Sequence, residues 1–219
     1  MEAATRKEVE RLCKIGVLRK INNSEWAAPT FIHPKKNGRV HFISDFRELN
    51  KRIKRKPYPL PKIQDLLQRL EGFTYATSLD LNMGFYHLTL DPDTQKLCAI
   101  ILPWGKYEYL QLPMGACNSP DLFQEHMSKL MAGLEFVRVC VDDILCLTKG
   151  DFDDHLQKLE QVFMRIQDAN LRINAEKSFF AKSEVEYLGF KIDRQGIRPI
   201  AKKVEAIQAL QPPETRRQL

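Results

Sequence analysis

The chain has 219 residues, of which 43% are hydrophobic and 28% are charged, and its formal net charge is +6. These values are ordinary for a soluble globular protein with a core, and they exclude a disordered or low-complexity chain. No apolar run reaches the length of a membrane span, and the five cysteines form no C-x-x-C pair, so we expect neither a membrane protein nor a disulfide framework. The positive net charge gives weak support to a polyanionic partner.

The N-terminal segment predicts one helix followed by a pair of strands. Thr5 and Glu8 have the spacing of a capping box, which marks the start of a helix. Residues 26–32 and 40–46 are apolar and extended, and the Asn37-Gly38 turn signal between them predicts that they pair as a hairpin.

Two basic clusters lie in the first sixty residues. One surrounds the predicted turn and consists of Lys35, Lys36 and Arg39. The other is the run of residues 51–56, which has five cations in six positions and is followed by the helix-breaking Pro57, Pro59 and Pro61. Each cluster is compatible with a solvated charged surface, the commoner case, and with a contact to nucleic-acid phosphates.

The middle of the chain predicts a strand that ends in an acidic residue. A helix is expected from Pro61 to Gly72, and residues 73–81 then form a strand with Asp80 near its C-terminal end. Further short strands are predicted at residues 87–90, 96–102 and 107–112, with a turn at Asp91-Pro92-Asp93.

The C-terminal half predicts two amphipathic helices around a hairpin. Ser119 and Pro120 begin the first helix, and residues 151–169 form the second. Between them, residues 137–148 alternate apolar and polar side chains around Asp142 and Asp143, which predicts a hairpin with both aspartates at its tip. Strands are expected at 171–173 and 185–192, a turn at Gln195-Gly196 and a helical fragment at 204–210.

The three aspartates of these strands suggest a metal site. Asp142 and Asp143 alone would be read as a solvated turn, which Asp favours. Because an antiparallel α+β sheet can bring the end of the Asp80 strand beside the hairpin tip, we expect three carboxylates to converge there. Such carboxylates cannot all stay ionised without cations, and their oxygen atoms suit Mg²⁺. Two ions about 3.5–4 Å apart would support phosphoryl transfer, and the basic surface points to nucleic acid.

These residues resemble the reverse transcriptase of Gypsy-type LTR retrotransposons and retroviruses, and the resemblance covers almost the whole chain. Five motifs follow the order of that family: DFRELN at 45–50, SLDL at 78–81, LPMGACNSP at 112–120, CVDD at 140–143 and YLG at 187–189. The resemblance implies the α+β fold of a right-hand polymerase, with an antiparallel palm sheet backed by helices. It places fingers at 1–55 and 88–118, palm at 56–87 and 119–193, and a truncated start of a thumb or connection at 194–219.

The same resemblance implies the site residues. Asp80, Asp142 and Asp143 would be catalytic and, with the backbone carbonyl of Leu81, would hold two Mg²⁺ ions, for which Mn²⁺ is an expected substitute. The residues expected to contact the incoming dNTP are Lys35, His41, Phe85 and Met114. Tyr187, Leu188 and Gly189 would form the primer grip.

Two of these assignments keep an alternative role. Phe85 matches a side chain that excludes a ribose 2′-OH, but it also fits a core aromatic beside Tyr86. Lys177 matches a lysine proposed to protonate pyrophosphate, but it also fits an ordinary surface lysine.

Departures from the family pattern leave two functions open. Cys140 replaces the aromatic residue of the Tyr-x-Asp-Asp box, and His41 replaces an arginine, although histidine is mostly neutral at pH 7. One hypothesis is an RNA-directed DNA polymerase that adds dNTPs to a primer 3′-OH on an RNA or DNA template. The other is a catalytically weak or inactive, retroelement-derived fragment that binds nucleic acid.

The remaining expectations concern the surroundings of the protein. No membrane partner is expected, and the RNase H and integrase of a retroelement polyprotein are expected partners that this sequence does not contain. The location is expected to be intracellular, either cytoplasmic, including virus-like particles, or nuclear.

Overall fold

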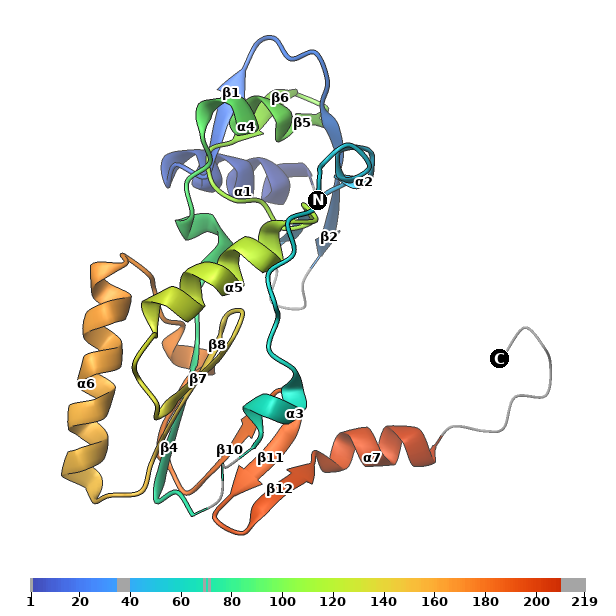
Figure 1. Cartoon of the computed structure of the whole chain (residues 1–219). Helices are drawn as coiled ribbons and strands as arrows, with labels where there is room; N and C mark the ends of the chain where they lie inside the picture. The colour runs from blue at the N-terminus through green and yellow to red at the C-terminus, as the bar shows by residue number, and fades with distance from the viewer. Residues whose placement is uncertain (1, 35–39, 69, 71, 210–219) are drawn as a thin grey trace. The chain divides into compact units, whose positions relative to one another are not determined.

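The computed structural model describes residues 2–34, 40–68, 70 and 72–209, and it divides into two compact units (Figure 1). The first unit consists of Met1–Leu60, Asn82–Leu130 and Gln167–Arg172. The second unit consists of Pro61–Leu81, Met131–Ile166 and Ile173–Leu219. Among the described residues, no helix combines the length and the apolar character that crossing a membrane would need.

The first unit is built on a mixed five-stranded sheet. Its strands lie in the order β1 (Leu18–Ile21), β6 (Gly105–Tyr109), β5 (Ala99–Leu102), β2 (Ala28–Pro34) and β3 (Val40–Ser44). All neighbours are antiparallel except β2 and β5. The predicted pairing of β2 with β3 is therefore confirmed, while the turn at 35–39 with its three cations lies outside the described residues.

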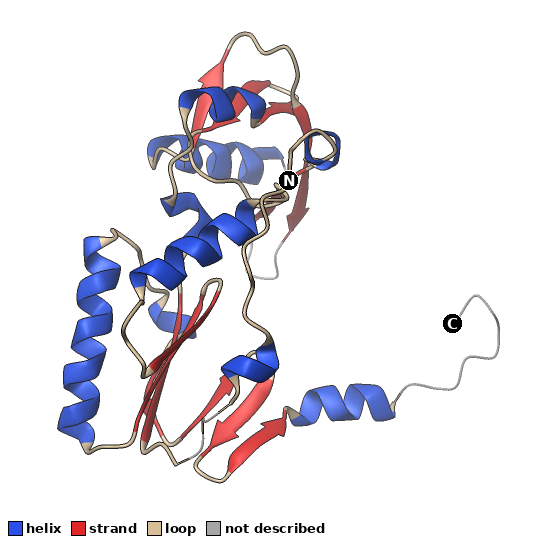
Figure 2. Ribbon diagram, viewed as in Figure 1, coloured by secondary structure: helices blue, strands red, loops and turns tan. Residues whose placement is uncertain are grey.

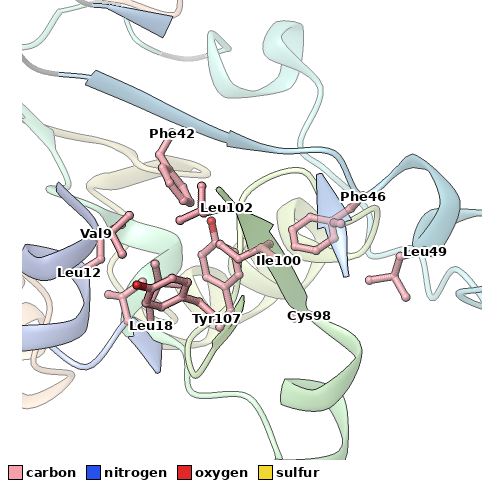
Figure 3. Packing of buried hydrophobic residues seen from close by; sticks show 13 residues of the cluster. Val9, Leu12, Leu18, Phe42, Phe46, Leu49, Cys98, Ile100, Leu102 and Tyr107 are labelled. Atoms are coloured by element: carbon pink, nitrogen blue, oxygen red, sulfur yellow. The ribbon is translucent and has the colours of Figure 1, made fainter. Parts of the chain in front are cut away.

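Helix α1 (Glu2–Lys14) covers part of this sheet and supplies apolar side chains to its core. Figure 3 shows Val9 and Leu12 of α1 close to side chains of the strands. The helix begins before Thr5, so the predicted capping box is wrong: Thr5 lies inside the helix and is fully buried. Its burial against the core outweighs the local preference of threonine for a cap.

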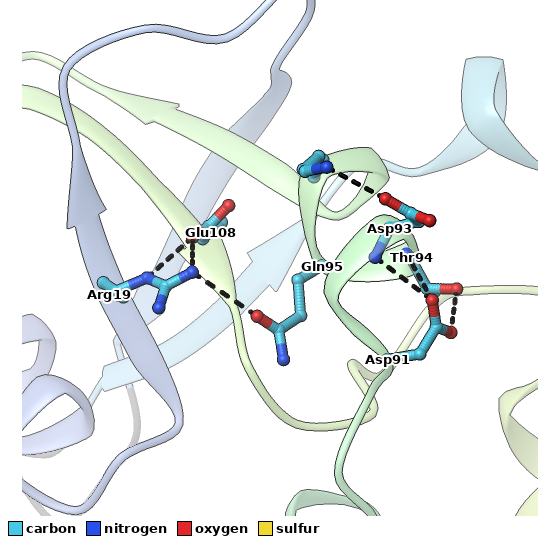
Figure 4. Close-up of polar contacts among 7 residues, drawn as sticks. Arg19, Asp91, Asp93, Thr94, Gln95 and Glu108 are labelled. Atoms are coloured by element: carbon cyan, nitrogen blue, oxygen red, sulfur yellow. Dashed lines mark hydrogen bonds and ion pairs between the residues drawn. The ribbon is translucent and has the colours of Figure 1, made fainter.

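A second helix replaces the predicted turn at residues 91–93 and the first two residues of the strand predicted at 96–102, whose remainder is confirmed as β5 (Ala99–Leu102). Asp91 accepts hydrogen bonds from the backbone N–H groups of Asp93 (3.1 Å) and Thr94 (3.0 Å), and Pro92 occupies the first turn, so residues 92–97 form helix α4 (Pro92–Leu97; Figure 4). The prediction treated Asp-Pro as a turn signal, but the pair is equally a helix start.

The first unit has two further short helices and one longer helix. They are α2 (Arg47–Asn50), the 3₁₀ helix η1 (Gly84–His87) and α5 (Ser119–Leu130), which confirms the helix predicted at Ser119. The strand predicted at 87–90 is wrong, because only an isolated bridge between Thr89 and Gln111 forms there.

The second unit contains an antiparallel sheet of four strands. Their order is β7 (Val137–Cys140), β8 (Asp143–Thr148), β4 (Tyr75–Asp80) and β9 (Phe179–Lys182). Helix α6 (Phe152–Asp168) runs alongside this sheet (Figure 2), and it buries one face of its amphipathic surface. The predicted hairpin, the Asp80 strand and the second amphipathic helix are confirmed.

A smaller antiparallel sheet completes the second unit. It consists of β10 (Glu184–Tyr187), β11 (Phe190–Asp193) and β12 (Gly196–Pro199). The single strand predicted at 185–192 is instead two strands joined by Leu188 and Gly189, whose φ angles of 49° and 81° suit a two-residue hairpin turn.

Three short helical segments also belong to the second unit: α3 (Ile63–Leu66), η2 (Ala175–Lys177) and α7 (Ala201–Gln208). Helix α3 is much shorter than the helix predicted from Pro61 to Gly72. The strand predicted at 171–173 is reduced to a bridge between Ile173 and Leu81.

His155 joins α6 to the four-stranded sheet. Its Nε2 lies 2.8 Å from Thr77 Oγ1 and its Nδ1 lies 2.8 Å from Thr148 Oγ1, and the ring is fully buried. Burial lowers the pKa of His155, since a charged imidazolium would lose its hydration there.

This bridge predicts a loss of stability in acid. Because the folded pKa of His155 lies below its unfolded value of about 6.5, the unfolded state binds the proton first. The stabilising contribution is complete above that value and is lost as the pH falls toward the folded pKa. Urea unfolding between about pH 7.5 and 5 should therefore show a steeper loss for the natural chain than for His155→Gln. Equal slopes would contradict the assignment.

Candidate active site

The end of β4 and the β7–β8 hairpin bring acidic residues together. In the pairing of β4 with β8, Asp80 lies opposite Asp143. The backbone N–H of Leu81 donates a hydrogen bond of 3.1 Å to the carbonyl of Asp142. Residues about sixty positions apart in the sequence are thus neighbours in the second unit. The sequence analysis predicted that the end of the Asp80 strand lies beside the hairpin tip, and the pairing agrees with this.

The hairpin turn is tight and strained. Cys140 and Asp143 pair across the two strands, so Val141 and Asp142 alone form the turn, and Asp143 is the first residue of β8 rather than part of the tip. Val141 has a φ of 54°, which β-branched residues rarely adopt. Such strain persists only where the surrounding structure imposes it, and it is concentrated at functional sites.

Negative charge accumulates at this point. The pKa of Asp143 is raised, first by burial and then by the carboxylates of Asp142 and Asp80, while Lys177 acts in the opposite direction. Either a proton or a cation would relieve this repulsion.

The donor atoms fit a hard divalent cation, because carboxylate and carbonyl oxygens are what Mg²⁺ prefers. Within the described ranges, no three His, Cys, Asp or Glu side chains already form a cage around one point.

Lys177 is a close neighbour of the acidic cluster. Its Nζ lies 3.5 Å from Oδ2 of Asp80, and two-thirds of its side chain is exposed. The backbone N–H of Asn174 donates to the carbonyl of Asp80 (2.8 Å), and that of Asp80 donates to Oγ of Ser178 (3.2 Å), so the segment that carries Lys177 is held against β4. The family resemblance already gave Lys177 a role at the active site, but no sequence pattern indicated its ion pair with Asp80.

Tyr187 lies in the core of the second unit. Its side chain is 2% exposed, and its hydroxyl has no hydrogen-bond partner among the described residues. Burial raises the pKa of Tyr187, and Cys140 and Asp143 add smaller effects in the same direction. The pKa of the Cys140 thiol is likewise raised, by burial first and then by Asp143. Residues of the β7–β8 hairpin therefore influence the ionisation of Tyr187, which lies at the end of β10 next to the turn formed by Leu188 and Gly189.

The first unit contains the other predicted site residues. The ring of Phe85 packs against Phe123 with 5.0 Å between centroids, and Gly84 lies so close that a Cβ there would be 2.7 Å from the Phe123 ring. Phe85 is half-buried and has this packing contact, while its contact with a ribose 2′-OH stays a prediction; one ring can have both roles.

The remaining predicted contacts to the nucleotide also belong to the first unit. Met114 is 45% exposed. His41 lies opposite His33 in the β2–β3 pair, and Lys35 is outside the described residues.

Two motifs of the first unit meet through one side chain. Asn50, the last residue of the DFRELN motif, donates from Nδ2 to the carbonyl of Gly115 (2.9 Å) and accepts from the N–H of Cys117 (2.9 Å). Ser119 donates to the carbonyl of Pro113 (2.6 Å), which closes the LPMGACNSP loop on itself.

Comparison with known proteins agrees with this arrangement. A family model described as reverse transcriptase (RNA-dependent DNA polymerase) matches residues 33–192. The uncharacterized protein K02A2.6 of Caenorhabditis elegans is 35% identical over 99% of this chain and 17% of its own length. The retrovirus-related Pol polyprotein from transposon opus of Drosophila melanogaster is 33% identical over 100% of this chain and 22% of its own length.

Solved structures of viral proteins have the same fold. The foamy viral protease-reverse transcriptase dRH in complex with double-stranded DNA has a TM-score of 0.91 and 28% identity, over 99% of this chain and 38% of that chain. The foamy viral protease-reverse transcriptase in complex with an RNA/DNA hybrid has a TM-score of 0.87 and 27% identity, over 100% of this chain and 30% of that chain. The present chain thus spans about a fifth of the curated relatives and less than half of these structures.

Proposed function

The chain belongs to the reverse transcriptase (RNA-dependent DNA polymerase) family, and we propose that it extends the 3′-OH of a primer on an RNA or DNA template by using dNTPs. The observation that carries this proposal is the register that sets Asp80 opposite Asp143, next to the turn residue Asp142. The α+β fold, with antiparallel sheets backed by helices, is that of the fingers and palm of this family.

Asp80 and Asp142 would hold two Mg²⁺ ions, with Asp143 and the carbonyl of Leu81 beside them and Mn²⁺ as a substitute. When bound, such ions favour deprotonation of the attacking hydroxyl and neutralise the charge of the leaving pyrophosphate. The strained turn at Val141 keeps the Asp142 side chain at the end of the hairpin, and the Leu81–Asp142 hydrogen bond ties it to β4.

The other residues have positioning roles in this proposal. Lys177, whose Nζ lies 3.5 Å from Oδ2 of Asp80, would supply positive charge there and would donate a proton to the leaving pyrophosphate. Tyr187, Leu188 and Gly189, at the end of β10 and in the turn that follows it, would orient the primer end. Catalysis of this kind depends on positioning and charge neutralisation more than on covalent chemistry.

We propose Lys35, His41, Phe85 and Met114 as the residues that contact the incoming dNTP. The partner nucleic acid would be a primer–template duplex, since double-stranded DNA and an RNA/DNA hybrid are bound by the foamy viral relatives.

A second candidate function is nucleic-acid binding with little or no catalysis. Cys140 favours it, because this residue pairs with Asp143 where the family has an aromatic side chain. A small thiol offers less surface to a primer end than an aromatic ring does.

Primer extension separates the two functions. With a labelled primer, dNTPs and Mg²⁺, the chain should extend primers on both RNA and DNA templates, and a chelator should abolish extension but leave binding in place. Oligonucleotide binding should be followed in parallel by fluorescence anisotropy. Binding without any extension, in Mg²⁺ or in Mn²⁺, would overturn the polymerase proposal and support the second candidate.

A further inference from the structure

Helix α6 of the second unit exposes apolar side chains next to the face that it buries. Phe152 and Leu156 remain 47% and 46% exposed. Leu159 and Phe163 continue their line along the helix, the first buried and the second half-buried. Positions 152, 156, 159 and 163 follow one another at steps of four, three and four residues, so they form a continuous stripe. Such a stripe is the surface that one helix offers to another.

The stripe contains a shallow hollow with a volume of about 360 Å³, lined by Leu156, Gln157, Leu159, Glu160 and Phe163. Positions 156, 159, 160 and 163 are mutual neighbours on the helix surface. In packed helices, a side chain of one helix inserts between four such residues of the other. Phe180 of β9 widens the apolar surface, because its ring centroid lies 6.4 Å from that of Phe163. The hollow therefore fits a side chain of a facing helix.

The exposed charges of α6 all have the same sign. The exposed carboxylates are those of Asp153, Glu160 and Asp168. The two cations of the helix, Lys158 and Arg165, are half-buried, and each already has a partner within the second unit. Because the whole chain has a net charge of +6, α6 presents an acidic face on a basic protein.

We propose that this face of α6 is the docking site for a basic amphipathic helix of a partner protein. An aliphatic side chain of the partner occupies the hollow, and its Lys or Arg residues lie beside Glu160. Exposed apolar surface with a polar rim is typical of protein interaction sites, and an amphipathic helix is a common occupant of such a surface.

Charge argues against the other occupants of this face. The phosphates of nucleic acid and the headgroups of an anionic membrane would be repelled by its carboxylates. A second copy of the chain, docked α6 against α6, would place carboxylates opposite carboxylates, and such like-charge contacts are costly.

The test is fluorescence anisotropy of the full chain with a labelled synthetic helix that has leucines at three- and four-residue steps and lysines at the flanking positions. We expect binding that weakens as the salt concentration rises. A peptide of identical composition, with its leucines distributed around the helix, should bind at least about tenfold more weakly. Since both peptides have the same charge, this difference measures the apolar fit.

Two pairs of variants locate the binding site. Leu156→Gln removes a wall of the hollow and should weaken binding about tenfold, while Met164→Gln, at an exposed position of α6 outside the hollow, should change it less than about twofold. Glu160→Gln should reduce the salt dependence of binding, whereas Glu186→Gln, at an exposed position of β10, should leave it unchanged.

Equal binding of the two lysine peptides, or equal losses in Leu156→Gln and Met164→Gln, would overturn the proposal. Self-association of the chain that Leu156→Gln abolishes, measured by analytical ultracentrifugation, would also overturn it, because a second copy would then be the occupant. The assay measures peptide binding alone, so its result does not depend on whether the chain extends primers.

Discussion

Asp142→Asn is expected to reduce primer extension by at least about 10³-fold while the chain stays folded. Asparagine has nearly the same size, and the hydrogen bond from Leu81 uses the backbone carbonyl of residue 142, so the turn should keep its geometry. What the variant removes is a negative charge beside Asp80 and Asp143 and an anionic ligand for Mg²⁺. Asp80→Asn should have a similar effect, because Asp80 lies across the same pair of strands.

The measurement is single-turnover incorporation of one dNTP, with circular dichroism to confirm folding. Asp153→Asn is the matched control, because Asp153 is an exposed residue of α6 in the same unit and should leave the rate unchanged. Activity of Asp142→Asn within about tenfold of the natural chain would reject the assignment of this residue as a metal ligand.

Phe123→Ala is expected to lower the free energy of unfolding by about 3–5 kcal/mol, the largest stability effect we foresee. The Phe123 side chain is fully buried and supports both the Phe85 ring and the backbone at Gly84. Urea unfolding measures the change. Phe31→Ala in the same unit is the control, because the Phe31 side chain is 57% exposed and its removal should cost less than about 1 kcal/mol.

The contact with Gly84 can be tested separately. In Gly84→Ala the new Cβ would lie 2.7 Å from the Phe123 ring, so the variant should be destabilised, and Phe123→Leu should remove most of that additional loss. If the two losses of stability simply add, the contact between residue 84 and the Phe123 ring is not the cause of the loss in Gly84→Ala.

Phe123→Leu should also change nucleotide selectivity. Phe85, which packs against Phe123, is the proposed barrier to ribonucleotides, so this variant should raise incorporation of rNTPs relative to dNTPs.

Local patterns were enough to identify much of the second unit. The period-two alternation of residues 137–148, the strand that ends in Asp80 and the amphipathic spacing of α6 each depend on neighbours within a few positions, and all three are confirmed. The five motifs, read in order, identified the family for the same reason, because each is a short, continuous stretch of sequence.

Local patterns predicted the wrong structure where one residue type is common in two different local structures. Asp91 and Pro92 suit a turn and a helix start equally, and α4 forms because the Asp91 carboxylate can reach two backbone N–H groups. Thr5 was assigned to a cap, but the core of the first unit buries it within α1.

By itself the sequence determined which residues are acidic, basic or apolar, which of them alternate, and to which family the chain belongs. Only the tertiary structure decided the register that sets Asp80 opposite Asp143, the ion pair between Lys177 and Asp80, and the hydrogen bonds that join Asn50 to the LPMGACNSP loop. The physical reason is that these are hydrogen bonds and charge contacts between segments sixty or more residues apart. Strand register and helix packing set such contacts, and no periodicity of the separate segments records them.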